Sequence, residues 1–217
     1  MALVLHGHPF SSCTQKVLVA LYENATPFTW RVLDTPETFD ELARLWPLRL
    51  MPVLLDGDVP VAETSIILEH LDLHHRGPVR LLPEDPAAAL EVRALDRFLD
   101  LYVMTPMQRV VADALRPEGT RDPRGVAEAR ARLEQAYAWL DTKLVGGAWT
   151  AGPGFTMADC AAAPALFYAD WVQPIDTAFG GVRALRRRLL RRPSFARVVD
   201  EARPFRQFFP LGAPDRD

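Results

Sequence analysis

The sequence contains little cysteine, no long apolar run and no large excess of either charge. Its 217 residues include two cysteines, Cys13 and Cys160, which lie far apart in the chain. Two isolated cysteines do not make a disulfide framework, so we expect a reducing, cytoplasmic location. No apolar segment reaches the length of a membrane span, and the N-terminus lacks the basic-then-apolar layout of a signal peptide. We therefore expect no association with a membrane.

The net charge and the histidines argue against two further kinds of partner. A net charge of −3 argues against binding to nucleic acid. The five histidines do not have metal-ligand spacing with either cysteine, so we expect no metal site. For His70, His74 and His75, which lie on or just after a helical pattern, we expect a solvated or helix-end role.

The first 80 residues alternate between strand and helix patterns. We expect strands over 2–6, 28–33, 53–55 and 59–62, and helices over 15–24, 38–45 and 65–75. Asp56-Gly57-Asp58 is a hairpin signal that joins the last two strands. The order is βαβαββα, which predicts a small α/β domain over residues 1–80.

Residues 86–217 have the pattern of an all-helical domain. We expect helices over 91–115, 125–144, 182–190 and 194–202, and a frayed tail from Gly212 onward. Another helix begins at Thr156, because Thr156 and Asp159 have the spacing of a capping box before an apolar run. The predicted architecture is an α/β domain followed by a helical bundle domain.

Three short motifs in the first 80 residues indicate a binding site. Met51-Pro52-Val53 places a proline at the start of an apolar strand, because proline cannot donate to a sheet ladder. Glu63-Thr64-Ser65 opens a helix with an acid and two hydroxyls, and the N-terminus of a helix attracts anions. Ser11-Ser12-Cys13 lies where the first strand gives way to the first helix. In this order the motifs predict a site for a thiol peptide on a thioredoxin-like fold.

With these motifs and its capping box, the chain resembles the cytosolic glutathione S-transferase family over nearly its whole length. The stretch from Pro9 to Val17 looks most like the serine-type and zeta-like bacterial members. The resemblance implies a thioredoxin-like domain followed by a helical domain, and a homodimer in which these two domains meet across subunits. It also implies glutathione as substrate or cofactor and a small electrophile as the second substrate.

The resemblance implies a role for each glutathione-binding residue. The Met51–Pro52 bond would be cis, and the backbone of Val53 would then pair with the cysteinyl unit of glutathione. Glu63 would meet the ammonium of the γ-glutamyl end, while Thr64 and its helix N-terminus would meet the carboxylate.

The candidate catalytic residues are Ser11, Ser12 and Cys13. A hydroxyl that donates to the sulfur of glutathione would favour the thiolate by about 1.5–3 kcal/mol. Ser11 aligns with the active-site position of the family, and Ser12 is the alternative if the helix begins one residue later. Cys13 has two possible roles. If the helix N-terminus lowers its pKa, Cys13 would assist an isomerisation or form a mixed disulfide. Otherwise it is a small buried apolar residue in the first turn of the helix.

Two other functions remain open beside glutathione transfer. One is a glutathione-dependent cis–trans isomerase, as in zeta-like members. The other is a non-catalytic glutathione-binding or interaction module. It is favoured by Leu50, which stands where many relatives have a polar residue that approaches the glycyl carboxylate of glutathione. Arg49 is the neighbouring residue that could take over this contact. On the helical domain we expect an acceptor pocket built from Met104, Met107, Arg109, Tyr168 and Trp171.

Overall fold

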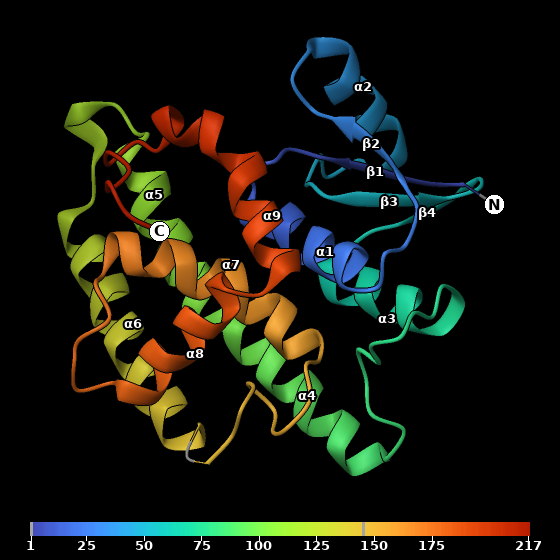
Figure 1. Cartoon of the computed structure of the whole chain (residues 1–217). Coiled ribbons are helices and arrows are strands. Elements are labelled where there is room, and N and C mark those ends of the chain that lie inside the picture. Colours follow the sequence, from blue (N-terminus) through green and yellow to red (C-terminus); the bar gives the residue numbers. More distant parts are fainter. Residues whose placement is uncertain (1, 145) are drawn as a thin grey trace.

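A mixed four-stranded sheet organises the first part of the chain, at the upper right of Figure 1. The computed structural model describes residues 2–144 and 146–217. The elements follow in the order β1 (Leu3–Gly7), α1 (Ser12–Glu23), β2 (Thr29–Val32), α2 (Pro36–Leu45), β3 (Val53–Asp56), β4 (Val59–Val61) and α3 (Thr64–His74). The strands lie in the order β2-β1-β3-β4, with β1 parallel to β2 and antiparallel to β3. The predicted βαβαββα order is confirmed.

Helices cover both faces of this sheet (Figure 1). α1 and α3 pack together on one face, and α2 lies on the other. Beneath α2, Leu33, Leu42 and Val53 form a small buried cluster. Leu5 and Leu54 belong instead to the main core of the molecule. Burial on both faces explains why the central strands β1 and β3 are almost continuously apolar.

The second part of the chain is a bundle of helices. These are α4 (Pro86–Phe98), a π-helical segment (Leu99–Met104), α5 (Thr105–Ala114), α6 (Pro123–Lys143), α7 (Met157–Val172), α8 (Gly180–Leu190) and α9 (Pro193–Ala202), with short 3-10 turns at Glu118–Thr120 and Arg203–Phe208. α7 is buried almost throughout and packs against α1, α4 and α8. Across residues 2–144 and 146–217, none of the helices is both long enough and apolar enough to cross a membrane.

The stretch predicted as one helix over 91–115 is helical from Pro86 to Ala114, but an unpredicted π-helical segment interrupts the regular hydrogen bonding between α4 and α5. Pro106 supplies the physical reason. It has no N–H to donate, and its ring collides with the carbonyl of the preceding turn in a regular helix. The wider turn relieves that collision, and the Thr105 hydroxyl donates to the carbonyl of Asp100 at 2.9 Å. The segment brings Asp100 and Met104 to the candidate site described below.

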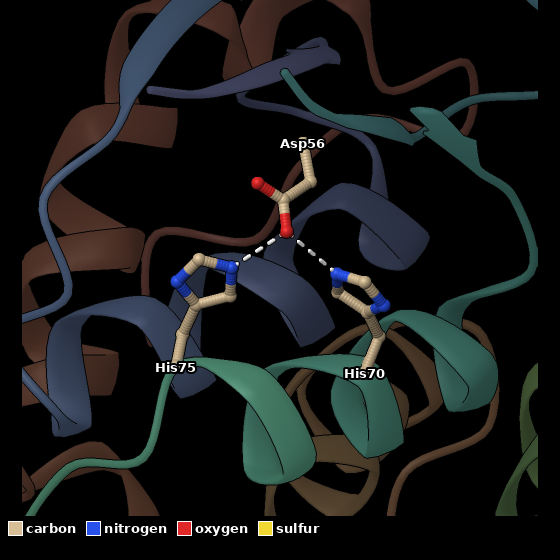
Figure 2. Close-up of side chains that lie close together, drawn as sticks. All are labelled: Asp56, His70 and His75. Carbon is tan, nitrogen blue, oxygen red and sulfur yellow. Dashed lines mark hydrogen bonds and ion pairs between the residues drawn. The ribbon is translucent and has the colours of Figure 1, made fainter. Parts of the chain in front are cut away.

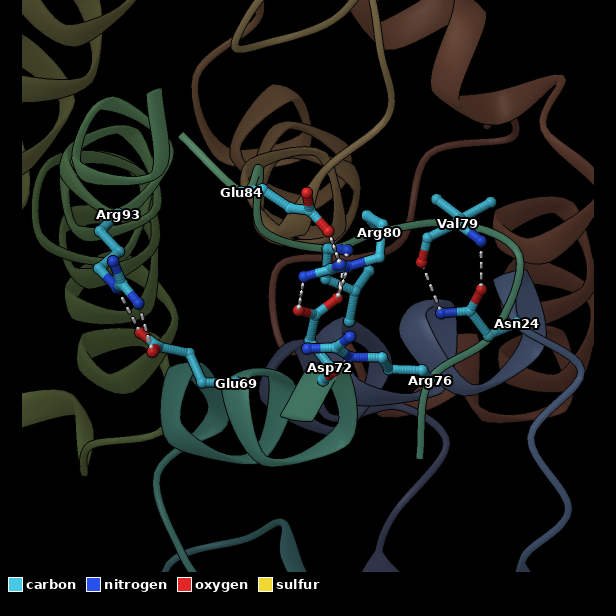
Figure 3. A network of polar contacts seen from close by, with 9 residues as sticks. Asn24, Glu69, Asp72, Arg76, Val79, Arg80, Glu84 and Arg93 are labelled. Atoms are coloured by element: carbon cyan, nitrogen blue, oxygen red, sulfur yellow. Dashed lines mark hydrogen bonds and ion pairs between the residues drawn. The ribbon is translucent and has the colours of Figure 1, made fainter. Parts of the chain in front are cut away.

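Ion pairs hold α3 against the start of the helical domain (Figure 3). Glu69 on α3 accepts two hydrogen bonds from the guanidinium of Arg93 on α4, each 2.8 Å long. Asp72, one turn further along α3, pairs with Arg80 in the connecting segment at 3.2 Å. These contacts join α3 to the first helix of the helical domain and to the segment that connects the two domains.

The capping box at the start of α7 is confirmed. The carboxylate of Asp159 accepts hydrogen bonds from the backbone N–H groups of Thr156 at 2.9 Å and Thr150 at 2.8 Å. The N–H of Met157 donates to the carbonyl of Leu81 at 2.9 Å. The start of α7 is therefore anchored both to its own domain and to the connecting segment.

The C-terminal tail is tied down, so the predicted fraying from Gly212 is wrong. Asp217 accepts hydrogen bonds from Arg203, at 2.5 and 3.1 Å, and from Arg206. Arg216 pairs with Asp170 of α7. The partners of the tail lie 11 to 46 residues away in the sequence, so its local composition does not reveal them.

Candidate functional site

A cleft between the sheet domain and the helical domain collects most of the predicted site residues. Its volume is about 570 Å³. Of the candidate catalytic and glutathione-binding residues, all except Ser12 and Val53 line it. They are joined by residues from the preceding loop and from the helical domain, including Arg49, Leu50, Arg97, Asp100, Met104 and Gln108. The three motifs that are separated in sequence thus meet at one place.

Ser11 stands at the boundary between this cleft and a second, apolar cavity of about 410 Å³. Ser11 is the N-cap of α1, and its Oγ accepts a hydrogen bond from the N–H of Thr14 at 3.3 Å. This bond uses an acceptor position of the oxygen and leaves the hydroxyl proton available for a ligand. Ser11 therefore has the position and the donor that thiol activation requires.

Ser12 is placed differently from its neighbour. It is the first residue of α1, it is buried, and it lines the apolar cavity but not the cleft. The helix begins at the register that makes Ser11 its cap, which favours Ser11 over Ser12 as the residue that faces a bound thiol.

The Met51–Pro52 peptide bond is cis, as the resemblance implied. Val53 begins β3 and is opposite His6 of β1. On its other side, the pairing with β4 ends at Leu54, which is opposite Val61. Within the described chain, the second backbone edge of Val53 therefore has no strand partner, and an extended peptide can pair there.

Glu63 and Thr64 form the wall opposite Ser11. Glu63 has a φ of +67°, a left-handed conformation that is uncommon for a residue with a side chain and is often found at functional sites. Its carboxylate makes no capping bond to α3 and is exposed at the cleft. Thr64 is the first residue of α3, so its N–H lies at the positive end of the helix dipole. An acid and a helix N-terminus side by side suit a ligand that carries an ammonium next to a carboxylate.

Cys13 is in the cleft, but its surroundings do not activate it. Burial raises the pKa of the Cys13 thiol, and the carboxylate of Asp100 raises it further, which outweighs the charge of Lys16. The amide of Gln108 lies 3.8 Å from the sulfur. The lowered pKa that a helix N-terminus suggested for Cys13 is therefore not favoured by its environment.

The helical domain adds charged residues that the sequence motifs did not identify. Arg97 and Asp100 line the cleft from α4 and the π-helical segment. Arg49, exposed and at a φ of +55°, lies on the same cleft as Leu50. The Thr105–Pro106 pair is the signal that could have located the π-helical segment, whereas nothing near Arg97 in the sequence distinguishes it from a solvated arginine.

Of the five residues predicted to build an acceptor pocket, two line one cavity. Met107 and Tyr168 line the apolar cavity. Met104 lines the cleft instead. Arg109 lies elsewhere, within 3.7 Å of carboxylate oxygens of Asp122 and Glu128, and Trp171 does not line either cavity. Arg109 lies two residues after Met107 on α5, so the two side chains point to different faces of that helix.

Two histidines have contacts that the sequence did not predict (Figure 2). Nε2 of His70 and Nε2 of His75 lie 2.9 and 2.7 Å from the same carboxylate oxygen of Asp56, at the end of β3. The expected helix-end role is correct for His75, which is the C-cap of α3, but neither ring is simply solvated, because Asp56 from the end of β3 lies against both.

Comparison with protein families shows two matches along the chain. Residues 5–79 match the model of the glutathione S-transferase N-terminal domain, and residues 123–200 match that of the glutathione S-transferase C-terminal domain. The first match contains the Ser11, Pro52 and Glu63 motifs, and the second contains the capping box of α7.

Individual relatives agree with these matches. A crystal structure of a glutathione S-transferase from Methylobacterium radiotolerans in complex with glutathione sulfonate is 31% identical, covers 92% of this chain and 95% of its own, and superposes with a TM-score of 0.79. A probable maleylacetoacetate isomerase of Vibrio cholerae is 25% identical over 94% of this chain and 98% of its own length. FtsZ-localized protein A of Caulobacter vibrioides is 26% identical over 92% of each.

Proposed function

Because the chain belongs to the glutathione S-transferase family, we propose that it is a glutathione transferase whose Ser11 activates the thiol of glutathione for attack on a small, apolar electrophile. The observation that carries the proposal is the position of Ser11 between the polar cleft and the apolar cavity. A sulfur held by this hydroxyl lies where two substrates can meet.

Charge complementarity assigns an end of glutathione to each wall of the cleft. The γ-glutamyl end carries an ammonium and a carboxylate, which match Glu63 and the α3 N-terminus at Thr64. The cysteinyl unit pairs with the open backbone edge of Val53. The glycyl carboxylate then points toward Arg49, which supplies the cation that Leu50 lacks.

Ser11 acts by stabilising the charged form of the sulfur. The free thiol has a pKa of about 8.5 and is mostly protonated at neutral pH. A hydrogen bond to a charged acceptor contributes about 1.5–3 kcal/mol, or about one to two pKa units. That shift makes the thiolate the majority form near pH 7. The thiolate attacks an electrophilic carbon, and the leaving group departs with the electron pair of its broken bond.

The second cavity defines the class of electrophile. Its walls are mostly apolar and come from both domains: Phe10, Met107, Val111, Leu115, Tyr168 and Phe209 are among them. Such a lining selects a compact apolar or aromatic compound, and holding it beside the thiolate supplies much of the rate.

The test is a pH titration of thiolate absorbance with glutathione bound to wild type, Ser11→Ala and Ser12→Ala. We expect a bound thiol pKa about one to two units below that of free glutathione in wild type. Ser11→Ala should restore the ordinary value, and Ser12→Ala, the matched control on the adjacent residue, should not. A bound thiol with an unshifted pKa in wild type would contradict activation by Ser11.

Two relatives make alternative outcomes worth measuring in the same assay. The likeness to the probable maleylacetoacetate isomerase favours a variant in which glutathione is recovered unchanged beside an isomerised product. The likeness to FtsZ-localized protein A favours a binding module. Recovery of a conjugate supports transfer, an isomerised product supports the first alternative, and an inert wild type that still binds glutathione supports the second.

We further propose that the enzyme is a homodimer in a reducing cytoplasmic setting. α3 and α4 both expose large apolar side chains, among them Ile66, Leu73 and Leu90. Cys13 and Cys160 are free thiols. Light scattering on the purified chain should give twice the mass of one subunit, and charged substitutions at Leu73 and Leu90 should reduce it to one.

A further inference from the structure

We infer that Asp56, His70 and His75 form a binding site for a divalent transition-metal ion, with Zn²⁺ as the cation that fits best. One carboxylate oxygen and two Nε2 atoms lie within 4.8 Å of one another (Figure 2). This inference does not rest on the proposed transferase activity.

The three side chains come from regular elements and not from loops. Asp56 ends β3, where its backbone is paired with both Leu3 of β1 and Val59 of β4. His70 lies on α3 and His75 is the residue that caps its C-terminus. A strand end and a helix end thus fix the three ligands, which favours a defined coordination geometry.

The three ligand atoms suit a metal ion of intermediate hardness such as Zn²⁺. Two imidazole nitrogens and one carboxylate oxygen are ligands that Zn²⁺ accepts, at distances of about 2.0–2.2 Å. A set of three protein ligands leaves a further position for water, as zinc allows. Ca²⁺ and Mg²⁺ prefer oxygen ligands, so the two imidazoles disfavour them.

The environment also favours a cation. The carboxylate of Asp56 is mostly buried, and its second oxygen, Oδ1, has no hydrogen-bond partner within the described chain. The site lies at the C-terminal end of α3, where the helix dipole is negative. A mostly buried carboxylate with an unused oxygen is costly, and a cation held at Oδ2 would offset its negative charge.

The alternative is a hydrogen-bonded cluster with no role for metal, in which each imidazole donates Nε2–H to the same oxygen. The distances of 2.7 and 2.9 Å are those of such hydrogen bonds. Tetrahedral ligand atoms around zinc are roughly 3.4 Å apart, so binding requires the two contacts to open slightly. It also requires each neutral imidazole to carry its proton on Nδ1, so that the lone pair of Nε2 is free to bind the metal. We favour the metal site because the cluster gathers, at one place and from a strand end and a helix, three ligand atoms of the kinds that Zn²⁺ accepts.

The experiment is a zinc titration of the untagged full-length protein after treatment with a chelator, read by competition with a chromophoric chelator. We expect one Zn²⁺ per chain. Asp56→Asn, His70→Ala and His75→Gln should each weaken binding by about tenfold or more. Two control variants should leave it unchanged. His74→Ala removes an exposed imidazole from the same helix, whose ring lies 4.6 Å from that of His70. Cys13→Ser removes the thiol of the cleft.

Cobalt gives a readout that does not depend on any variant. Co²⁺ bound to the wild-type protein should show visible absorption of a four- or five-coordinate nitrogen and oxygen site, without a band from thiolate ligation. Circular dichroism and glutathione binding check that each variant is folded. The inference is overturned if the wild type binds no stoichiometric zinc, or if binding survives the His70→Ala and His75→Gln double variant. It is equally overturned if binding is lost in His74→Ala or Cys13→Ser.

Discussion

The ammonium of Lys16 lies 2.7 Å from a carboxylate oxygen of Asp96, and both side chains are almost wholly buried. Lys16 belongs to α1 and Asp96 to α4, so the pair joins the two domains directly behind the cleft. Asp100 and the hydroxyl of Ser65 also contact the ammonium, at 2.9 and 3.1 Å. Burial alone would lower the pKa of Lys16, but the two carboxylates outweigh burial and raise it. Lys16 is therefore charged at all ordinary pH values.

Removing one partner of this buried pair should destabilise the protein strongly. Lys16→Met leaves the carboxylate of Asp96 without its cation, and we expect the free energy of unfolding to fall by about 3–5 kcal/mol. The double variant Lys16→Met with Asp96→Leu should recover most of that loss, because neither charge remains buried. Urea unfolding of the three proteins measures both effects. Equal stability of wild type and Lys16→Met would show that the pair contributes nothing.

Glu63→Gln should weaken glutathione binding without affecting the fold. The change removes the negative charge that we assign to the γ-glutamyl ammonium, and a charge-assisted hydrogen bond is worth about 1.5–3 kcal/mol, or about 10- to 150-fold in affinity. Calorimetric titration with glutathione measures the loss. Glu69→Gln, on the same helix but paired with Arg93, is the matched control and should bind glutathione like wild type. Equal weakening in both variants would point to a general effect on α3.

Cys13 should react slowly with alkylating agents at neutral pH. The thiolate is the reactive form, and a raised pKa means that less of it is present at pH 7 than in an ordinary cysteine. The rate should therefore rise as the pH passes through and beyond the ordinary thiol range of about 8.5. Mass spectrometry after timed alkylation measures it residue by residue. Cys160 is fully buried and should stay unmodified in the native protein.

Burial is the larger cause of the raised Cys13 pKa, and a variant tests the second cause, the charge of Asp100. Asp100→Asn removes the anion nearby that disfavours the thiolate, so alkylation of Cys13 at pH 7 should become faster. Asp85→Asn, at the start of α4, serves as a control that removes an aspartate outside the cleft. Alkylation of wild-type Cys13 faster than that of free cysteine at pH 7 would revive the redox mechanism.

Local chemistry explains which features could be predicted from the sequence. Pro52, the Glu63-Thr64 pair and the Thr156–Asp159 box each act within a few residues of chain, so their spacing carries the structural information. The order of strands and helices follows from hydrophobic periodicity, which burial on both faces of the sheet makes strong in β1 and β3. The sequence alone did not decide whether α1 is capped by Ser11 or by Ser12, because both residues are good N-caps and they are adjacent.

The remaining features depend on contacts between distant segments. Asp56 contacts His70 and His75 only because β3 and α3 pack together. The histidines lie 14 and 19 residues after Asp56, and no metal-binding motif has that spacing. Arg109 lies two residues after Met107 and therefore on another face of α5, where its partners Asp122 and Glu128 come from the next helix and the residue before it. The π-helical segment before α5 follows from Pro106, which cannot donate the backbone hydrogen bond that a regular helix needs at that position.

Phe208→Ala should change the use of the electrophile and leave glutathione alone. Phe208 lines the apolar cavity and is mostly exposed, so its truncation enlarges the pocket at little cost in stability. Part of an aromatic contact of about 1–3 kcal/mol is lost, and we expect KM for an aromatic electrophile to rise about tenfold. Phe39→Ala is the control. It removes a ring of the same size that is exposed on α2 and does not line the cavity, so both KM values should stay unchanged. Steady-state kinetics with each substrate varied in turn separates the two. The opposite result would be a rise in KM for glutathione in Phe208→Ala with KM for the electrophile unchanged. It would contradict binding of the electrophile in this cavity, because the 3-10 turn that carries Phe208 would then affect the glutathione cleft instead.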